Sequence, residues 1–195
     1  MSDQASARES MLERYREYLQ LIARLEVDGR FLGKLDFSGV VQQTLLEAHQ
    51  GWEKYRGKCD SELLAWLRRI LGNNLIDEMR RLSAQARDVQ RERSLDAGLE
   101  ESSARVEKWL AADQSSPSER MMREEQMCRM ACALAQLPDD QRLAVELHHL
   151  RGMSLAEVAE QMDRTRGAVA ALIFRGLESI RKILDDDQYQ PPGPI

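Results

Sequence analysis

Residues 154–184 read SLAEVAEQMDRTRGAVAALIFRGLESIRKIL, and this stretch decides the fold class. Ser154 and Glu157 have the S-x-x-E spacing of a capping box, in which each side chain accepts a hydrogen bond from the other residue's backbone N–H at a helix start. An apolar face follows at i, i+3, i+4 and i+7, formed by Leu155, Val158, Ala159 and Met162. The first part of the stretch therefore predicts a short amphipathic helix.

A second helix is predicted directly after the first. Asp163 and Arg164 occupy a polar turn, and Thr165 is a suitable N-cap because its hydroxyl can accept a hydrogen bond from a free backbone N–H. Apolar residues then recur at helical spacing, namely Val169, Leu172, Ile173, Leu177, Ile180 and Leu184. Two helices joined by a tight turn favour a helix-turn-helix DNA-binding motif. The alternative is an ordinary amphipathic helix pair with arginines on its exposed side.

Charge is segregated along this part of the chain. Residues 139–163 hold six acids and two bases, a net charge of −4, whereas residues 164–182 hold five bases and one acid, a net charge of +4. Cations at the start of the second helix suit phosphate contacts. The small residues Gly167, Ala168, Ala170 and Ala171 would let that helix approach a DNA groove closely. These features favour DNA binding over a plain helix pair.

The composition of the 195-residue chain is that of a protein without membrane segments. Charged residues make up 31% of it, and no apolar run approaches the roughly 18 residues needed to span a bilayer. The first residues, MSDQASARESMLERYREY, lack the apolar core of a signal peptide, so we expect a cytoplasmic protein with no membrane insertion. The net charge of −5 argues against nonspecific coating of nucleic acid, although a local basic face can still bind it.

The three cysteines, Cys59, Cys128 and Cys132, do not form a disulfide framework. Cys128 and Cys132 could join His148 and His149 as four zinc ligands, but their spacing fits no standard zinc pattern. We therefore expect no metal and interpret this cysteine pair as small buried apolar residues. Cys59 lies beside Lys58, a setting that can activate a thiol, so a redox role stays open for it.

No motif in the chain indicates an enzyme. An H-x-E with C-x-x-C, an H-E-x-x-H and a phosphate-binding glycine loop are all absent from the sequence. We therefore expect no catalytic residues and no cofactor.

Helical periodicity covers most of the chain, and no period-2 alternation is long enough for a strand. Ser38 stands near the start of the second predicted helix, and Ser61 is expected to cap the third. The expected helices before the helix-turn-helix are residues 8–27, 36–52, 61–83, 119–137 and 139–151. The sequence predicts an all-α fold.

A second basic zone lies at residues 66–93, where seven bases and four acids give a net charge of +3. Trp66 lies within this zone, and Tyr55 lies in the polar loop at 53–61 that precedes it. Cations interleaved with aromatic rings suit stacking on unpaired bases. The alternative is that Trp66 is a core residue.

Composition changes between the two basic zones. Residues 94–120 are rich in Asp, Glu, Ser, Ala and Gln, with a Ser-Ser-Pro-Ser run at 115–118. We interpret this segment as a flexible acidic linker between two small helical domains. The predicted boundaries are a first domain at 8–93, the linker at 94–120, a second domain at 121–184 and a disordered tail at 185–195.

This organisation resembles a bacterial RNA polymerase sigma factor of the extracytoplasmic-function type, a two-domain relative of sigma-70. The resemblance covers about residues 10–93 and 122–184. LDFSGVVQQTLLEAH at 35–49 is similar to the family's helix that binds the β′ clamp helices of the polymerase. The polymerase-binding residues that the resemblance implies are Asp36, Val41, Gln42, Thr44 and Leu45. Gly39 and Gln43 depart from the acids often found there.

The segment AWLRRILGNNLIDEMRR at 65–81 is similar to the family's promoter-melting helix. The resemblance implies that this helix and the 53–61 loop capture a flipped base of the minus-ten element. Extruding a base costs a few kcal/mol, which stacking and hydrogen bonds in a pocket can recover. The implied minus-ten residues are Tyr55, Arg56, Lys58, Trp66, Arg69, Asn73 and Arg80, with Arg68 and Arg81 as further backbone contacts.

The second domain looks like the family's reader of the minus-thirty-five element. The implied DNA contacts are Arg164, Thr165, Arg166, Ala168, Ala171 and Arg175. Many relatives carry Lys, Ser and Arg where this chain has Ala170, Ala171 and Leu172, so fewer direct polar contacts are expected. Shape and phosphate contacts would then matter more than base reading.

The resemblance implies a promoter-specificity subunit with no chemistry of its own. Its expected partners are core RNA polymerase, through the β′ clamp helices and the β flap, and promoter DNA. An anti-sigma factor is a further partner compatible with the family. The alternative is a stand-alone helix-turn-helix regulator with an N-terminal sensing or dimerisation domain, which leaves the pattern at 36–81 unexplained.

Overall fold

The computed structural model describes residues 2–27, 34–57, 60–82, 101, 104 and 120–186. Every regular element within these ranges is helical, which confirms the all-α prediction. The α-helices are α1 (Ser2–Glu13), α2 (Arg16–Glu26), α3 (Phe37–Gly51), α4 (Asp60–Leu82), α6 (Arg120–Ala135), α7 (Asp139–Val145), α8 (Leu155–Gln161) and α9 (Arg166–Asp185). A 3-10 turn at Trp52–Lys54 follows α3, and a π-helical segment at Glu146–Leu150 follows α7.

Helix α3 begins with a side-chain cap from Asp36. Its carboxylate accepts a hydrogen bond from the backbone N–H of Gly39 at 3.0 Å. A Cβ atom at Gly39 would lie 2.6 Å from this carboxylate, so the glycine leaves room for the cap. Ser38, which the sequence placed near the helix start, lies exposed within the first turn. Ser61 likewise lies inside α4, because that helix begins at Asp60.

The predicted helix at 8–27 is divided into two helices. Helix α1 ends at Glu13 and α2 begins at Arg16. The buried residues of α2 are Tyr18, Leu19, Leu21, Ile22, Ala23 and Leu25. At about 100° per residue they cover an arc of about 200°, wider than the stripe of a one-sided surface helix. Helix α2 therefore needs apolar neighbours on more than one side.

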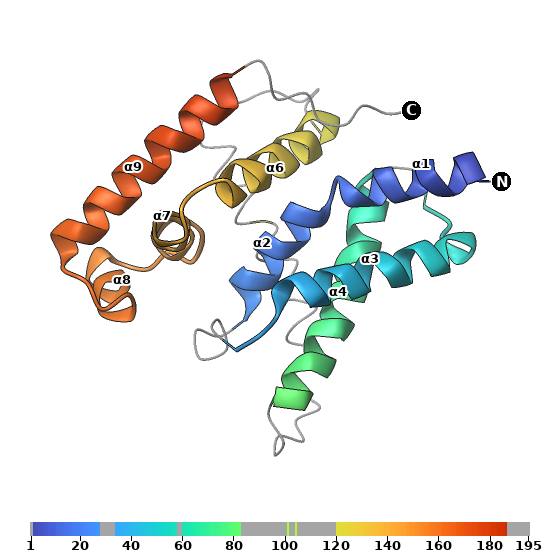
Figure 1. Ribbon diagram of the computed structural model, residues 1–195, viewed down its shortest axis with the longest axis horizontal. Coiled ribbons are helices and arrows are strands. Elements are labelled where there is room, and N and C mark those ends of the chain that lie inside the picture. The colour runs from blue at the N-terminus through green and yellow to red at the C-terminus, as the bar shows by residue number, and fades with distance from the viewer. Residues whose placement is uncertain are drawn as a thin grey trace.

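These neighbours come from both halves of the chain. Helix α2 packs against α3 and α4, and also against α6 of the second half (Figure 1). Helix α6 in turn contacts α9. One continuous core cluster joins residues of α1 to α4 with residues of α6, α7 and α9. The two halves, which the sequence predicted as separate domains, thus share a core in this structure.

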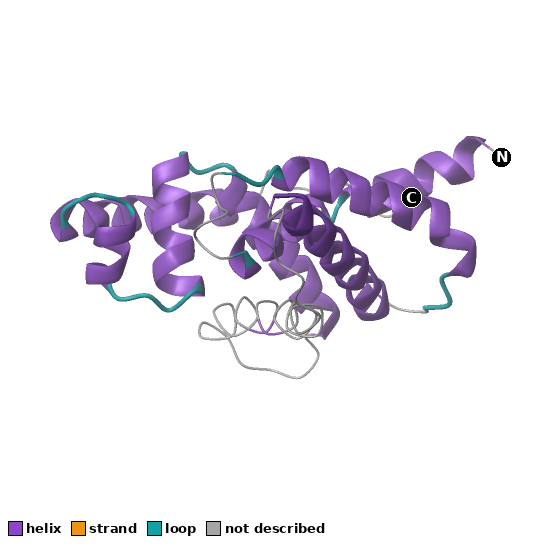
Figure 2. Ribbon diagram, turned by 90° about the horizontal axis from the view of Figure 1, so that it is seen from below, coloured by secondary structure: helices purple, strands orange, loops and turns teal. Residues whose placement is uncertain are grey.

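A smaller core lies within the helix-turn-helix. Its buried residues are Ala144, Leu147, Val158, Ala159, Val169 and Ile173. This motif lies at one end of the described helices and α1 lies toward the other (Figures 1 and 2). Most of the predicted linker at 94–120 and the end of the predicted tail, from 187 on, lie outside the described residues, so the domain boundaries stay predictions.

The helix predicted at 139–151 changes its hydrogen-bonding pattern along its length. It is α-helical at Asp139–Val145 and π-helical at Glu146–Leu150. The backbone N–H of Arg151 donates to the carbonyl of Glu146 at 2.9 Å, which is the i to i+5 bond of a π-helix. Gly152 follows with a φ of 71°, a left-handed conformation that glycine adopts without strain and that ends the helix.

Helix α9 crosses α7 at close range. A Cβ atom at Gly176 would lie 2.9 Å from a methyl carbon of Val145, so the missing side chain permits this crossing. At the other end of α9, the guanidinium of Arg129 on α6 donates to the carbonyl of Leu184 at 3.1 Å. These contacts fix α9 to the helices behind it, so that its opposite face is free to meet a ligand.

Candidate nucleic-acid interface

The capping box predicted at the start of the helix-turn-helix is confirmed. The backbone N–H of Ser154 donates to the Glu157 carboxylate at 2.7 Å, and the N–H of Glu157 donates to the Ser154 hydroxyl at 3.3 Å. The hydrogen bonds from Ser154 hold the pKa of Glu157 below its usual value. This cap sets where α8 begins and, through α8, the direction of the turn.

The turn between α8 and α9 has the tight geometry that the motif needs. Asp163 has a φ of 51°, a left-handed conformation in which Asp is less strained than most residues. The N–H of Arg164 then donates to the carbonyl of Ala159 at 2.9 Å, which closes the turn. Thr165 is the N-cap of α9 as predicted, because its hydroxyl accepts from the N–H of Ala168 at 3.2 Å.

Helix α9 carries four of the six residues predicted to contact duplex DNA, and Arg164 and Thr165 directly precede it. Arg166, Ala168 and Arg175 are exposed, and Ala171 is half-buried. Between the two arginines runs a strip of small residues, and a Cβ atom at Gly167 would meet nothing within 4 Å. A helix with this surface can lie deep in a major groove, with its arginines at the rims.

One residue of this face was not predicted from the sequence. Phe174 is 70% exposed, the highest value among the exposed large apolar side chains of the described residues. It lies one helical turn beyond Ala170 and Ala171, at the C-terminal end of the small-residue strip. An aromatic side chain out of phase with the apolar stripe Val169, Ile173 and Ile180 was the signal that could have revealed it.

Arg164 differs from the other arginines of the motif. Its guanidinium forms an ion pair with the carboxylate of Asp140 on α7 at 2.5 Å. Both side chains are about half exposed, so this pair contributes little stability and can exchange for a phosphate. The contact orients Arg164 before any DNA arrives.

In the first half, three aromatic rings form a cluster around the end of α3. Tyr55 stacks on Trp66 with ring centroids 4.8 Å apart and an interplanar angle of 22°. Trp52 lies against both rings, at 5.3 Å from Tyr55 and 6.3 Å from Trp66. All three are partly exposed, and Trp66 packs on the core, whereas its stacking on unpaired bases stays a prediction. Lys58 lies outside the described residues.

Polar side chains extend this site along α4. Arg69, Asn73 and Arg80 are exposed and follow one another at helical spacing on one face. Arg80 pairs with Asp77 at 3.3 Å and Arg81 with Glu78 at 3.1 Å, so acids one turn earlier offset part of this charge. Arg56 is also exposed, and its guanidinium donates to the carbonyl of Glu53 at 2.8 Å.

Arg68 has a different role from its neighbour Arg69. It is partly buried, and its guanidinium donates to the hydroxyl of Tyr18 on α2 at 3.0 Å. The side chain thus ties α4 to α2. The prediction that Arg68 holds the DNA backbone is not supported by this inward direction.

The polymerase-binding residues expected on α3 divide into two groups. Asp36 and Gln42 are exposed, whereas Val41, Thr44 and Leu45 are buried in the core. The side chains of the buried three pack into the core and do not face outward in this structure, so their role in polymerase binding stays a prediction. The Thr44 hydroxyl donates to the carbonyl of Val40 at 2.8 Å and accepts from Asn74 of α4 at 3.2 Å.

The surface that α3 presents is instead formed by Gln42, Gln43 and Leu46. Leu46 is 49% exposed, an unusual value for a leucine in a helix packed on a core. Beside it, α3 and α4 enclose a groove of ≈ 450 Å³. Its lining residues are mostly polar and acidic: Asp36, Gly39, Val40, Gln43, Glu47, Asn74, Asp77, Glu78 and Arg81. This surface suits a partner with basic side chains.

Comparison with known proteins explains why these surfaces occur in one chain. Residues 13–85 match the family model for Sigma-70 region 2, and residues 129–180 match the model for Sigma-70, region 4. The ECF RNA polymerase sigma-E factors of Salmonella typhimurium strain LT2 and Escherichia coli strain K12 are each 32% identical to this chain over 166 residues, which cover 83% of the chain and 78% of each relative. This chain belongs to the extracytoplasmic-function (ECF) sigma factors.

A further relative has a slightly lower identity. The ECF RNA polymerase sigma-E factor of Haemophilus influenzae is 30% identical over 151 residues, which cover 77% of the chain and 76% of that protein. As an ECF sigma factor the chain binds core RNA polymerase and promoter DNA, and it directs promoter-specific transcription initiation. Sigma factors are not a class of enzyme, in agreement with the lack of catalytic motifs.

The described residues contain neither a cluster of metal ligands nor a helix that could span a membrane. No group of three or more His, Cys, Asp or Glu side chains there is arranged to hold a metal ion. No helix within the same ranges has the length and apolarity that a membrane span requires. Cys128 and Cys132 are half-buried on α6, whereas Cys59 lies outside the described residues.

Proposed function

We propose that this ECF sigma factor divides promoter recognition between two helices of different surface chemistry. Helix α9 reads the duplex minus-thirty-five element through its exposed small-residue face. The aromatic cluster and the polar face of α4 hold unpaired bases of the minus-ten element. The surface of Gln42, Gln43 and Leu46 on α3 binds the β′ clamp helices, and the second half contacts the β flap.

The observation that carries this proposal is the contrast between the exposed aromatic groups of the two halves. Tyr55 and Trp66 already stack on each other beside exposed cations, which suits the capture of a flat unpaired base. Phe174 stands alone on a helix face of small residues, which suits an apolar contact with a thymine methyl group in a major groove. Each half thus fits the form of DNA assigned to it.

The test of this division uses two templates with one promoter sequence. One is fully duplex, and the other is already unpaired across the minus-ten element. With core polymerase and the wild-type chain, both should support initiation. Replacing Tyr55 with Ala should reduce initiation on the duplex by about tenfold, a loss of about 1.4 kcal/mol, and reduce it less on the opened template.

Equal losses on both templates would overturn the assignment of α4 to strand opening. The control variant is Tyr55→Phe, which keeps the stacked ring and loses only the hydroxyl. The alternative function, a stand-alone helix-turn-helix regulator, is tested by measuring promoter binding of the free chain. It predicts stable and specific duplex binding by the free chain at physiological salt, whereas a sigma factor of this kind should bind promoters well only with polymerase.

An anti-sigma factor would be a further partner of this chain. Such an inhibitor would have to cover two surfaces of the sigma factor. One is the acidic groove with the exposed Leu46 in the first half, and the other is Phe174 in the second half. Copurification of a protein that blocks both core binding and promoter binding would support that part of the proposal.

A further inference from the structure

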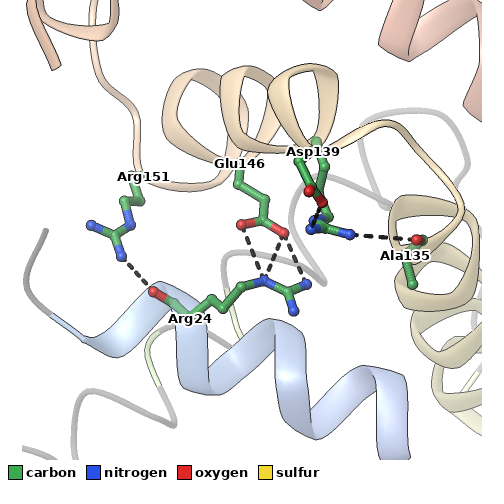
Figure 3. A network of polar contacts seen from close by, with 6 residues as sticks. Arg24, Ala135, Asp139, Glu146 and Arg151 are labelled. Atoms are coloured by element: carbon green, nitrogen blue, oxygen red, sulfur yellow. Dashed lines mark hydrogen bonds and ion pairs between the residues drawn. The ribbon is translucent and has the colours of Figure 1, made fainter. Parts of the chain in front are cut away.

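An ion pair shielded from solvent joins the two halves. Arg24 of α2 donates from Nε and Nη2 to Glu146 of the π-helical segment at 3.1 and 3.0 Å. The side chains are 15% and 5% exposed. Figure 3 shows the two side chains meeting between facing elements from opposite ends of the sequence. A pair this shielded is screened little by salt, and removing one partner leaves a buried charge.

A second contact across the same interface involves Arg151. Its guanidinium donates to the carbonyls of Arg24 and Val27, the latter at 2.7 Å. Helix α2 ends at Glu26, so these carbonyls belong to the helix end, where partners within the helix run out. A cation at a helix C-terminus is also favoured by the helix dipole. Arg151 therefore caps α2 from the other half of the chain (Figure 3).

The π-helical segment explains why both contacts reach the same place. In a regular α-helix, residues five apart lie about 140° apart around the axis. Here the N–H of Arg151 bonds to the carbonyl of Glu146, so the two residues lie one turn apart. Both can then face α2. Turns of a π-helix are frequent at functional sites. This one lets Glu146 and Arg151 both contact the end of α2.

The closed arrangement conflicts with simultaneous binding of both promoter elements. Elements named for positions −10 and −35 lie about 25 base pairs apart, which is roughly 85 Å along duplex DNA at 3.4 Å per pair. Helices α4 and α9 are only about 35 and 30 Å long at 1.5 Å per residue. They are held to one core through α2 and α6. The halves must therefore separate before both helices reach their elements.

The covalent chain permits this separation. Residues 83–119 connect α4 to α6, and a fully extended chain of that length reaches about 120 Å. Separation would expose apolar surface of the core cluster that α2 and α6 share. Exposing such surface to water is unfavourable, so the free chain should stay closed until polymerase holds the halves apart.

We propose that Arg24, Glu146 and Arg151 form a latch that keeps the free sigma factor closed and limits its binding to core polymerase. This inference rests on the proposed two-element promoter contact. If only open molecules bind polymerase, the apparent affinity of the chain is reduced in proportion to the fraction of molecules that are open. The latch thus sets how readily the chain competes for polymerase.

The test compares the full chain with the Glu146→Gln variant, which keeps the side-chain shape and removes the charge. Small-angle X-ray scattering of the free chain should show a larger radius of gyration in E146Q. Core polymerase should bind E146Q more tightly, by about three- to tenfold. The matched control is Glu13→Gln, which breaks the Arg16–Glu13 pair within the first half and should change neither quantity.

An unchanged radius in folded E146Q, or a larger radius without tighter polymerase binding, would overturn the latch. If E146Q loses its helical circular dichroism, Arg151→Gln, which removes the cap on α2 and keeps the Arg24–Glu146 pair, is measured in the same way. If both variants lose helix, the contacts are structural and the latch is overturned. The scattering measurement tests the latch without polymerase. Failure of the wild-type chain to support initiation would reject the proposed function but would leave the scattering result on the latch unaffected.

Discussion

Helices α4 and α9 both expose cations, yet their surfaces differ in how those cations are used. On α4, Arg80 and Arg81 pair with acids three residues earlier. On α9, Arg166 and Arg175 are exposed, and no ion pair to another described residue is found for either of them. The first surface is partly neutralised, whereas Arg166 and Arg175 keep their charges, although Lys182 farther along α9 pairs with Glu178 at 2.9 Å.

This difference has a physical meaning for the two forms of DNA. Duplex DNA has a dense phosphate charge, and a bare cation gains affinity by releasing counterions from it. Unpaired bases offer flat apolar faces, and stacking on them depends little on net charge. The paired cations of α4 reduce nonspecific attraction while the Tyr55–Trp66 stack stays available. The surface of α9 therefore suits recognition by charge and shape, whereas α4 and the Tyr55–Trp66 stack suit recognition by stacking.

The largest expected effect is on the stacking side. Trp66→Ala removes a ring that contacts Tyr55 and Trp52 and packs on the core, so the free energy of unfolding should fall by about 3 kcal/mol. Urea denaturation measures this loss. Where circular dichroism shows that the variant is still folded, initiation on a duplex promoter should fall more than initiation on an opened one.

Trp66→Phe is the control, because it keeps an aromatic ring in contact with Tyr55. It should recover most of the stability and of the duplex initiation. A Trp66→Ala variant with unchanged stability and unchanged initiation would show that the aromatic cluster serves neither purpose.

The next effect tests the duplex-reading side. Gly176→Val places side-chain atoms where a Cβ alone would lie 2.9 Å from Val145, so α9 must shift away from α7. Overpacking of this kind should lower the free energy of unfolding by about 2 kcal/mol and weaken minus-thirty-five binding. Gly167→Ala is the matched control, since a Cβ there meets nothing within 4 Å. Equal stability of the two variants would refute the tight α7–α9 crossing.

Local sequence signals predicted the helix-turn-helix well. The capping box at Ser154 and the N-cap at Thr165 depend on residues three apart, and both are present in the structure. The N-cap of α3 was harder, because Asp36 and Ser38 both suit a helix start. Only the position of Gly39, which leaves room for the Asp36 carboxylate, decides between them.

Contacts between distant segments were not predictable in the same way. The resemblance assigned Val41, Thr44 and Leu45 to polymerase binding, but the packing of α3 on α4 and α2 buries them. Nothing local to Arg24 or Glu146 indicates that they meet, because 122 residues separate them. A signal was nevertheless present in α2, whose apolar residues cover too wide an arc for one neighbour.

A smaller effect sharpens the description of α9. Phe174→Ala should weaken minus-thirty-five binding by about 1 to 2 kcal/mol if the ring contacts a thymine methyl group. The direct measurement uses promoters in which deoxyuridine, which lacks that methyl, replaces each thymidine of the element. The wild-type holoenzyme should lose affinity with deoxyuridine, and the Phe174→Ala holoenzyme should lose none.

Arg175→Ala provides the matched control for this measurement. It should weaken binding as well, because Arg175 is exposed beside Phe174, yet it should keep the preference for thymidine. A Phe174→Ala variant that still prefers thymidine would exclude the methyl contact and leave Phe174 to a protein partner.

The smallest expected effect is a pH dependence that arises in the second half. Burial and the Coulombic interaction with His148 lower the pKa of His149 below its ordinary value of 6.5. The unfolded chain therefore binds a proton at this histidine more readily than the folded chain does. The stabilising contribution is present above pH 6.5 and is lost as the pH falls from there through the lowered pKa.

Urea midpoints should accordingly decrease between pH 7.5 and 5.5, and His149→Gln should make this decrease smaller. His148→Gln removes the Coulombic contribution but leaves the burial of His149, so it should keep a reduced dependence. If the decrease in His149→Gln equals that of the wild type, the titrating group lies elsewhere and His149 makes no pH-dependent contribution to stability.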